Sequence, residues 1–283
     1  MKRKKHLNNE YIDYNLLMSN ITSQWSTTMG ENVNVAILDT GIDYTHQNLK
    51  NSIKGGINFT SSNKLDFIDR NGHGTFVAGI IAGEKNENGI GGIAPKCNLY
   101  SVKILSDNCK GSIDNLSKGI DWCIENNINI ISMSLSYPIY NKQVHEIIKK
   151  AYDNNIILIA AAGNNKKTKI DFPARHDEVI GVTSINKNKK LSKFSNTGNN
   201  INFCAPGDNI ISTYLNNSYT VMSGTSMSVP HMTGIIALIQ SKSLKANGKL
   251  LNFKELMEVL LKNSIDLGDS GYDKKYGYGL FKF

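Results

Sequence analysis

Three residues of complementary type stand in short, glycine-rich segments of the chain. Asp39 lies in DTGID, His73 in NGHGT and Ser226 in SGTSMSVPH. A serine hydroxyl becomes a nucleophile when a histidine accepts its proton and a carboxylate holds that histidine in the right tautomer. The three segments can therefore supply one member each of a possible Asp-His-Ser triad, in the chain order Asp39, His73, Ser226.

A fourth polar residue, Asn164, stands directly after an apolar run and a glycine, in IAAAGNN. By itself such an asparagine is commonly a turn residue. Ser226 also has a simple structural interpretation, because serine often caps the N-terminus of a helix. The apolar pattern after Ser226 predicts a long helix, and we expect Pro230 in its first turns, where a missing N–H costs little. A helix N-terminus at this serine would favour negative charge that develops there.

Five short apolar runs predict buried strands, and the amphipathic stretches between them predict helices. The strands are expected at 33–38, 99–105, 128–135, 156–162 and 178–185. The helices are expected at 75–82, at 112–126 with Ser112 as N-cap, and at 142–154. This alternation is typical of an α/β fold with a mostly parallel sheet and helices on both faces. Such sheets bind ligands beyond the carboxyl ends of their strands, where Asp39 and Asn164 stand.

The motifs around these residues occur together in one order: VAILDTGID, NGHGTFVAGIIAG, IAAAGNN and SGTSMSVPH. With them the chain resembles the subtilases, the subtilisin-like serine proteases, from about Trp25 to Leu280. The resemblance implies a three-layer subtilisin-like α/β fold over residues 25–283, preceded by a short N-terminal extension at 1–24. It also implies a serine endopeptidase that hydrolyses peptide bonds through an acyl-enzyme intermediate, with polypeptides as its substrates.

The resemblance implies roles for further residues. Asn164 would donate a hydrogen bond to the oxyanion of the tetrahedral intermediate, together with the backbone N–H of Ser226. Two segments would bind the extended substrate as added strands: Lys110, Gly111 and Ser112, and Ser134, Leu135 and Ser136. Ser136 departs from the glycine that is usual in the family. Ala162 and Gly163 would form the floor of the primary specificity pocket, and no acidic residue stands at its rim, so a strict Lys/Arg preference is not expected.

Many subtilases hold calcium with a loop after the helix of the histidine and with an upstream aspartate. The corresponding loop here, EKNENGIGG at 84–92, offers Asn86 and backbone carbonyls, and the upstream position is Asn48. Calcium prefers several oxygen ligands that include real negative charge. We therefore expect no required cofactor and assign no metal ligands, and a calcium ion bound at this loop stays open as the alternative.

Composition and charge are those of an ordinary globular protein. The 283 residues are 40% hydrophobic and 20% charged, with a formal net charge of +8 and a pI of about 9.1. The lysines are scattered and accompany no nucleic-acid-binding motif, so no nucleic-acid partner is expected. No run of about 18 apolar residues predicts a membrane span. The basic N-terminus is not followed by the apolar segment of a signal peptide.

Four cysteines without a C-x-x-C pair suggest reduced thiols rather than a disulfide framework. Secreted subtilases carry a signal peptide and a long inhibitory prodomain. We expect neither in this chain, so it resembles the intracellular branch of the family. We expect a cytoplasmic protein. General protein turnover and the maturation of a peptide by leader removal both fit this expectation.

Other classes of enzyme fit the sequence poorly. An α/β-hydrolase needs G-x-S-x-G and a histidine far downstream, but GTSMS lacks the final glycine and only His231 follows Ser226. The segment HEIIK at 145–149 lacks the second histidine of the H-E-x-x-H zinc motif. The alternative is a catalytically silent scaffold with a subtilase fold, although such a protein would be expected to lose triad residues.

Overall fold

One large sheet organises the molecule. The computed structural model describes residues 14–85 and 91–283, and in them nine strands lie in the order β10-β11-β7-β6-β5-β4-β1-β3-β2. The strands are β1 (Asn34–Asp39), β2 (Ile53–Asn58), β3 (Asn98–Lys103), β4 (Ile130–Met133), β5 (Ile157–Ala161), β6 (Val179–Ile185), β7 (Phe203–Pro206), β10 (Ser264–Ile265) and β11 (Leu280–Phe281). Every neighbouring pair is parallel except β10 and β11. The predicted α/β fold with a mostly parallel sheet is confirmed.

The five strands that the sequence predicted form the middle of this sheet. They are β3, β1, β4, β5 and β6, and each matches its predicted range to within a few residues. All residues of β4, β5 and β6 are buried. A strand covered by helices on both faces is apolar throughout, which is why continuous apolar runs mark these strands in the sequence.

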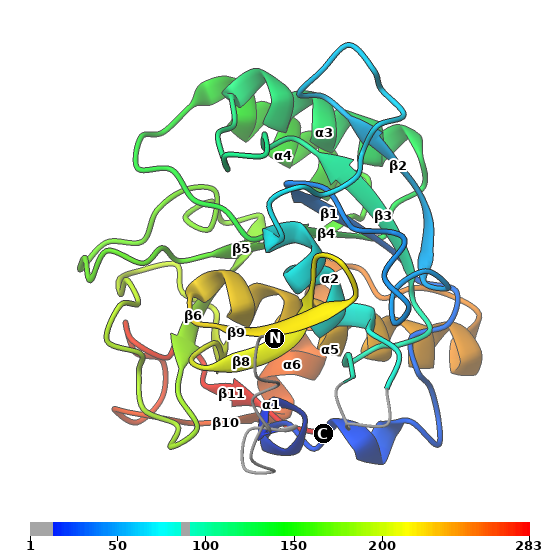
Figure 1. Cartoon of the computed structure of the whole chain (residues 1–283). Coiled ribbons are helices and arrows are strands. Elements are labelled where there is room, and N and C mark those ends of the chain that lie inside the picture. The colour runs from blue at the N-terminus through cyan, green and yellow to red at the C-terminus, as the bar shows by residue number, and fades with distance from the viewer. Residues whose placement is uncertain (1–13, 86–90) are drawn as a thin grey trace, which may run out of the picture.

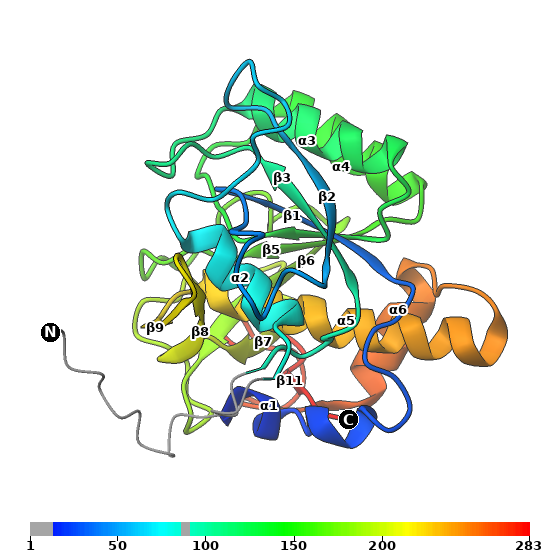
Figure 2. The same cartoon turned by 45° about the vertical axis from the view of Figure 1, so that its right-hand side comes forward.

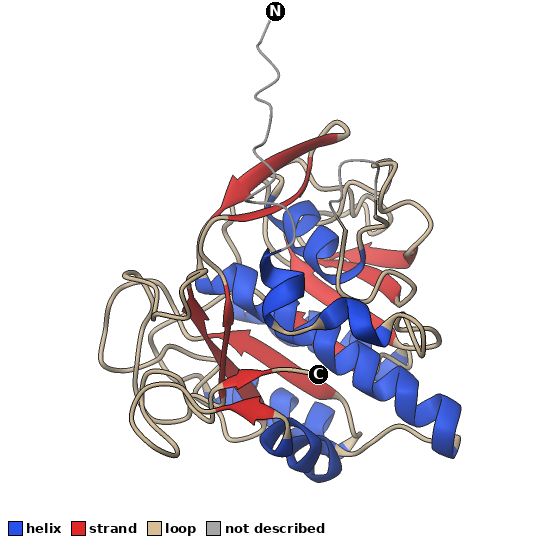
Figure 3. Cartoon of the chain, turned by 90° about the horizontal axis from the view of Figure 1, so that it is seen from below, coloured by secondary structure: helices blue, strands red, loops and turns tan. Residues whose placement is uncertain are grey.

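Helices cover both faces of the sheet (Figures 1 and 2). One face carries α2 (His73–Ala82), α5 (Thr225–Asn247) and α6 (Phe253–Lys262), which share one apolar core. The other face carries α3 (Ile113–Glu125) and α4 (Lys142–Asp153), which share a second core. α5, a helix of 23 residues, packs against β4, β5, β6 and β7, and it is the long helix that lies against the sheet in Figure 3. No helix within the described ranges is long and apolar enough to cross a membrane.

Polar side chains fix where several helices begin. Ser112 accepts the backbone N–H of Asn115 at 3.1 Å and caps α3, as predicted. Asn141 caps α4 in the same way. Asn252 and Glu255 form a reciprocal capping box at the start of α6. These caps satisfy N–H groups that the first turn of a helix leaves without partners.

Several elements were not predicted from the sequence. β2 reads IKGGIN, and its two glycines weaken the strand pattern. β7, β10 and β11 have four residues or fewer. The antiparallel hairpin of β8 (Ile210–Tyr214) and β9 (Ser218–Met222) stands apart from the main sheet. Short or partly exposed strands carry too few apolar residues to show a clear period.

The segment before Trp25 packs against the body of the protein in the part that the structure describes. It forms α1 (Tyr14–Met18) and a short 3-10 helix, η2 (Ile21–Gln24). Leu16 and Ile21 are fully buried in the core shared with α2 and α5. The backbone N–H of Phe283 donates to the carbonyl of Ser19 at 3.1 Å, so the C-terminus is bonded to this segment. Residues 14–24 therefore contribute to the main core.

Candidate active site

The order of the strands in the sheet changes direction at β1. β1 lies between β3 and β4, so strands that follow it in the chain are added on both of its sides. Open α/β sheets bind ligands in the crevice beyond the strand ends at such a point. Asp39 is the last residue of β1, and Ser134 directly follows β4. The candidate site is built on these two strand ends.

Asp39 and His73 form a direct pair. The Nδ1 atom of His73 lies 2.8 Å from Oδ1 and 2.9 Å from Oδ2 of Asp39. Asp39 is fully buried, whereas 21% of the His73 side chain is exposed. Oδ1 of Asp39 also accepts the backbone N–H of Thr40 at 2.7 Å, which helps to fix the carboxylate. A histidine whose Nδ1–H donates to a carboxylate keeps Nε2 unprotonated, so this nitrogen can act as a base.

The surroundings of His73 increase its proton affinity. Burial by itself lowers the pKa of a histidine, because it disfavours the charged ring. Here the negative charge of Asp39 and its hydrogen bond outweigh burial, with a smaller contribution from Asp69. The pKa of His73 is therefore raised above its ordinary value of 6.5.

Glycines let the helix that carries the histidine approach β1 closely. α2 begins at His73, two residues before Thr75, where the sequence analysis placed its start. A Cβ atom on Gly74 would collide with the backbone carbonyl of Gly41. Gly72 has a φ of +104°, in the left-handed region that favours glycine. The first turn of α2 can therefore lie against the loop that follows β1.

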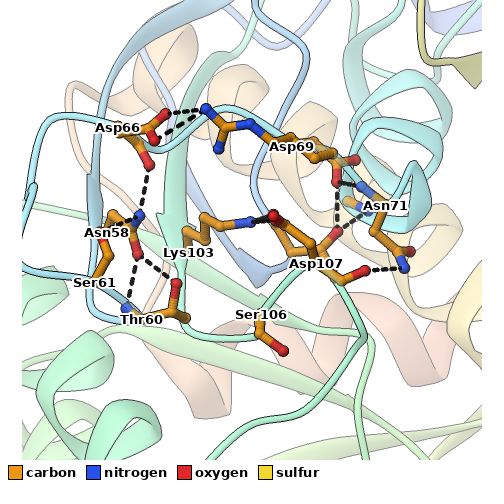
Figure 4. A network of polar contacts seen from close by, with 12 residues as sticks. Asn58, Thr60, Ser61, Asp66, Asp69, Asn71, Lys103, Ser106 and Asp107 are labelled. Atoms are coloured by element: carbon orange, nitrogen blue, oxygen red, sulfur yellow. Dashed lines mark hydrogen bonds and ion pairs between the residues drawn. The ribbon is translucent and has the colours of Figure 1, made fainter.

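A second buried carboxylate, Asp69, connects this loop to α2. Its Oδ1 accepts the hydroxyl of Thr40 at 2.9 Å and the backbone N–H groups of Asn71 and Gly72. Its Oδ2 accepts the backbone N–H and the hydroxyl of Thr75 at 2.9 and 2.7 Å. Figure 4 shows Asp69 next to Asn71 in this network. A carboxylate at a helix N-terminus is stabilised by the free N–H groups there, so Asp69 fixes the start of α2.

Asp69 and Thr40 were not among the predicted site residues. Asp69 stands four residues before His73, and an aspartate shortly before a helix is a signal for N-terminal capping that could have identified it. Lys103 gave no such signal. Its buried ammonium group donates to the carbonyl of Thr40 and lies 2.7 Å from Asp107 (Figure 4). Asp69 and Lys103 each bond to Thr40 and thus hold the loop after Asp39.

Ser226 is the second residue of α5, and Ser134 holds it from two sides. The hydroxyl of Ser134 donates to the backbone carbonyl of Ser226 at 2.8 Å, and the hydroxyl of Ser226 donates to the carbonyl of Ser134 at 3.1 Å. In an α-helix the carbonyl of Ser226 would accept the N–H of residue 230, but Pro230 has none. The hydroxyl of Ser134 replaces that missing helix hydrogen bond.

This arrangement corrects our expectation for Pro230. It is the sixth residue of α5, beyond the first turn whose N–H groups have no partner in any helix. Its missing N–H would therefore leave a helix carbonyl without a partner, and the hydroxyl of Ser134 prevents this. The sequence predicted Ser134 only as a contact for substrate.

Ser226 is bonded to a residue of the cleft that His73 lines. Ser134 and His73 both line it, and Ser134 is bonded to Ser226. No hydrogen bond joins Ser226 to His73 within residues 14–85 and 91–283. Catalytic hydrogen bonds often tighten only when substrate fills a site.

Asn164 lies beside the start of α5. Its Oδ1 accepts both the backbone N–H and the hydroxyl of Thr225 at 2.9 Å. The carboxamide is therefore oriented with its oxygen toward Thr225, the residue before Ser226. Nδ2 of Asn164 donates to no other residue in the described part of the chain, so this N–H group is available to a ligand. Thr225 was not predicted as a site residue.

The cleft beside His73 has a volume of about 490 Å³. Five of the residues expected to bind substrate line it: Gly111, Ser112, Ser134, Leu135 and Ser136. Four further apolar residues complete most of the wall: Ile104, Leu105, Ile113 and Leu116. No acidic residue contributes to the lining in the described ranges, so the cleft suits apolar side chains better than basic ones.

Three residues expected to bind substrate do not line this cleft. Lys110 is exposed, next to the lining residue Gly111 in the chain. Ala162 is fully buried, and its carbonyl accepts the side-chain N–H of Asn196 at 3.0 Å. The carbonyl of Gly163 accepts the backbone N–H of Asn196 at 2.9 Å. Asn196 thus holds the turn that leads from β5 toward the candidate site.

Cys109 and Tyr137 also line the cleft, and neither was predicted as a site residue. All four cysteines are free thiols, and Cys109 is the exposed one while Cys97, Cys123 and Cys204 are buried. Partial burial and the nearby charges of Asp39 and Asp69 raise the pKa of Cys109. The hydroxyl of Tyr137 is buried and has no hydrogen-bond partner among the described residues.

The residues described near the expected calcium position do not fit a calcium ion. Asn48 donates its side-chain N–H to the backbone carbonyl of Glu84 at 2.6 Å. Its side-chain oxygen accepts the hydroxyl of Tyr219. Both ends of the amide are therefore already used within the protein. Most of the predicted loop, 86–90 including Asn86, lies outside the described residues.

Known proteins resemble this chain over most of its length. The model of the subtilase family matches residues 30–279. An intracellular serine protease of Paenibacillus polymyxa is 41% identical over 264 residues, which cover 90% of this chain and 80% of that protein. The major intracellular serine protease of Bacillus subtilis is 40% identical over 247 residues, which cover 84% and 77%.

A longer relative is similar over even more of this chain. The minor extracellular protease Epr of Bacillus subtilis is 39% identical over 278 residues, which cover 96% of this chain but 41% of that protein. The similar proteins thus include intracellular and extracellular proteases, and this chain spans less than half the length of the extracellular one.

Proposed function

The chain belongs to the subtilase family and is a serine endopeptidase, and we propose that Asp39, His73 and Ser226 form its catalytic triad. One observation carries the proposal: His73, which is bonded to Asp39, and Ser134, which is bonded to Ser226, line one cleft. These residues come from β1, α2, the end of β4 and α5. Their approach to one another depends on the complete fold.

In the proposed reaction the Ser226 hydroxyl attacks the carbonyl carbon of a peptide bond. Nε2 of His73 accepts the hydroxyl proton, and Asp39 stabilises the resulting imidazolium. The C–N bond then breaks, and the same proton passes from Nε2 to the leaving amine. The acyl group stays on Ser226 as an ester. A water molecule that loses a proton to His73 hydrolyses this ester and regenerates the free serine.

Asn164 is proposed to stabilise the negative oxygen of both tetrahedral intermediates. Thr225 holds the Asn164 carboxamide with Nδ2 available, and the backbone N–H of Ser226 lies at the N-terminus of α5. Two such donors, aimed where charge develops, lower the barrier more than they strengthen the binding of substrate.

Polypeptides in an extended conformation are the proposed substrates. The segments around Gly111 and Leu135 flank the cleft and would pair with substrate backbone, while Lys110, Ala162 and Gly163 remain proposed substrate contacts. The apolar lining favours peptides with an apolar side chain near the cleaved bond. We propose that no cofactor is required and that the enzyme works in the cytoplasm, as the names of two relatives suggest.

Covalent labelling tests the triad. The full-length protein should react with a fluorophosphonate, a reagent that labels activated serines, and Ser226→Ala should abolish this reaction. Ser136→Ala is the matched control, because Ser136 lines the same cleft and should leave labelling intact. Equal labelling of wild type and Ser226→Ala would refute the assignment, and would favour a scaffold protein if neither is labelled.

Cleavage of a peptide library distinguishes the two proposed roles. General protein turnover requires cleavage at many apolar positions in unrelated peptides. Maturation of a dedicated peptide requires a narrow sequence preference. We propose turnover, because the cleft is apolar and has no charged lining residue within the described ranges other than His73. A preference confined to one sequence would favour maturation.

A further inference from the structure

A cluster of two histidines and a glutamate lies away from the triad. His145 is on α4, and His176 and Glu178 lie in the segment before β6. Nε2 of His145 lies 3.4 Å from a carboxylate oxygen of Glu178, and the rings of His145 and His176 are stacked with centroids 4.5 Å apart. One nitrogen or oxygen from each of the three side chains lies within 4.8 Å of the others.

Two polar atoms of this cluster have no partner inside the described protein. Nε2 of His176 and one carboxylate oxygen of Glu178 are buried and make no hydrogen bond to any residue in the described ranges. Only 4% of His176 is exposed. A buried polar atom without a partner is destabilising, so such atoms usually mark a bound ion, a water molecule or a functional role.

A hydrogen bond at His145 suits a metal ion. Imidazole binds metals only through an unprotonated nitrogen. The hydroxyl of Tyr140 lies 3.0 Å from Nδ1 of His145. When Nδ1 donates to Tyr140, Nε2 is unprotonated and faces Glu178, an arrangement common behind histidines that bind metals.

We propose that His145, His176 and Glu178 form a binding site for a divalent transition metal such as Zn²⁺. Two imidazole nitrogens and a carboxylate, with water in the fourth position, are a common ligand set for zinc. Calcium is disfavoured because it requires six or more oxygen ligands. Stacked rings do not direct their nitrogens at one point, so one ring must turn on binding. His145 is the ring free to do so, because 36% of its side chain is exposed.

A metal here would connect α4 to one wall of the cleft. His176 lies four residues after Phe172, and their rings are 4.8 Å apart. Phe172 and Tyr137 exchange two backbone hydrogen bonds of 2.7 and 2.8 Å, and Tyr137 lines the cleft. The bound ion would therefore stabilise the strand-like pairing beside the proposed substrate site. The inference does not depend on the proposed catalytic roles.

Zinc titration of the full-length, tag-free protein tests the site. All proteins carry Ser226→Ala to prevent self-digestion, and intact mass confirms that they are whole. We expect one Zn²⁺ per chain and an increase in the thermal unfolding midpoint. His145→Ala and Glu178→Gln should each weaken binding by about 100-fold or more, since loss of a mere supporting residue already costs about 10–100-fold. Tyr140→Phe should weaken it by about 10-fold.

Two controls separate this site from other places where zinc can bind. Glu146→Gln changes an exposed carboxylate next to His145 on α4 and should leave the affinity unchanged. His73→Ala should also bind one Zn²⁺ normally. The proposal is wrong if wild type binds no zinc, if His145→Ala and Glu178→Gln bind it as wild type does, or if His73→Ala alone abolishes binding. Circular dichroism of each variant verifies that it is folded.

Discussion

At the scale of single residues, the site depends on charges placed around one imidazole. Asp39 is fully buried and bonded to His73, and Asp69 lies near enough to contribute to the raised pKa of that histidine. The base is therefore stronger than a free histidine, but a larger share of it is protonated at neutral pH. The pH dependence of the reaction should therefore show the raised pKa of His73.

We predict that kcat/KM rises with pH through an apparent pKa above 6.5. Only neutral His73 can accept the serine proton, and its pKa is raised above 6.5 in the folded protein. Activity is therefore low below this pKa and reaches a plateau above it. Initial rates on a fluorogenic peptide between pH 5 and pH 9 measure the transition. An acidic limb with its midpoint below pH 6 would contradict the prediction.

We predict that Asn164→Ala lowers kcat by about 10²–10³-fold, a magnitude observed in subtilisin itself, a member of the same family. KM should change little, because the oxyanion forms only along the reaction. Asn165→Ala is the control, since Asn165 is the exposed neighbour and should keep kcat near that of wild type. If kcat is unchanged in Asn164→Ala, Asn164 does not stabilise the transition state.

At the scale of elements, the start of α5 lacks one helix hydrogen bond, and a residue outside the helix replaces it. Pro230 removes the helix partner of the Ser226 carbonyl, and the hydroxyl of Ser134, from the end of β4, takes its place. Ser226, the proposed nucleophile, is thus attached to the sheet through its own backbone carbonyl. A helix without proline would not need this contact.

We predict that Ser134→Ala lowers the free energy of unfolding by about 1 kcal/mol, the usual contribution of a hydrogen bond. The substitution leaves the Ser226 carbonyl without a side-chain donor, and kcat should also fall because Ser226 is held less firmly. Urea denaturation of the inhibited protein measures the change. Ser136→Ala alters an exposed serine two residues away and should remain within about 0.5 kcal/mol of wild type. Equal stability of both variants would refute the role of Ser134.

We predict that calcium changes thermal stability little. Asn48 uses both ends of its amide on Glu84 and Tyr219, and no carboxylate stands at this position. Unfolding midpoints in millimolar calcium and in EDTA, compared at constant ionic strength, should agree. A large increase in the unfolding midpoint with calcium would indicate a calcium site that involves residues 84–92.

At the scale of the whole molecule, two apolar cores lie on opposite faces of the sheet, and the N-terminal segment contributes to one of them. Ile21 is fully buried among residues of this core, although it precedes the region that the sequence motifs cover. The segment at 14–24 therefore affects the stability of the entire fold.

We predict that Ile21→Ala lowers the free energy of unfolding by about 2–5 kcal/mol, as expected when a buried isoleucine is truncated. Leu17→Ala is the matched control, because Leu17 lies in the same segment with 68% of its surface exposed, and should cost less than about 0.5 kcal/mol. Chemical denaturation of the inhibited full-length protein compares them. Similar stabilities of Ile21→Ala and Leu17→Ala would mean that residues 14–24 are a loosely attached extension.

The sequence predicted the central strands and the candidate triad because both depend on local patterns. Apolar runs mark β1 and β4 to β6, and short glycine-rich motifs mark Asp39, His73 and Ser226. The contacts of Asp69 with Thr40 and Thr75 could not be predicted in the same way. They join residues 29 and 6 positions apart through one buried carboxylate, and no periodic pattern records such a contact.

The cluster of His145, His176 and Glu178 was not predicted from the sequence, for a related reason. His145 was considered only within HEIIK, which has no second histidine nearby. The fold supplies His176 from the segment before β6, so the spacing in the chain says nothing about their distance. Contacts of this kind come from tertiary packing, and a motif search detects only ligands that are close in sequence.

The single accessible thiol gives the protein a natural attachment point for a dye. Cys109 is exposed at the cleft, while Cys97, Cys123 and Cys204 are buried. A maleimide fluorophore should therefore couple at one position without any engineered cysteine. Because that position adjoins the place where a peptide would lie, its emission should change on occupancy even in a protein that cannot turn over. The enzyme then becomes an optical sensor of its own ligands.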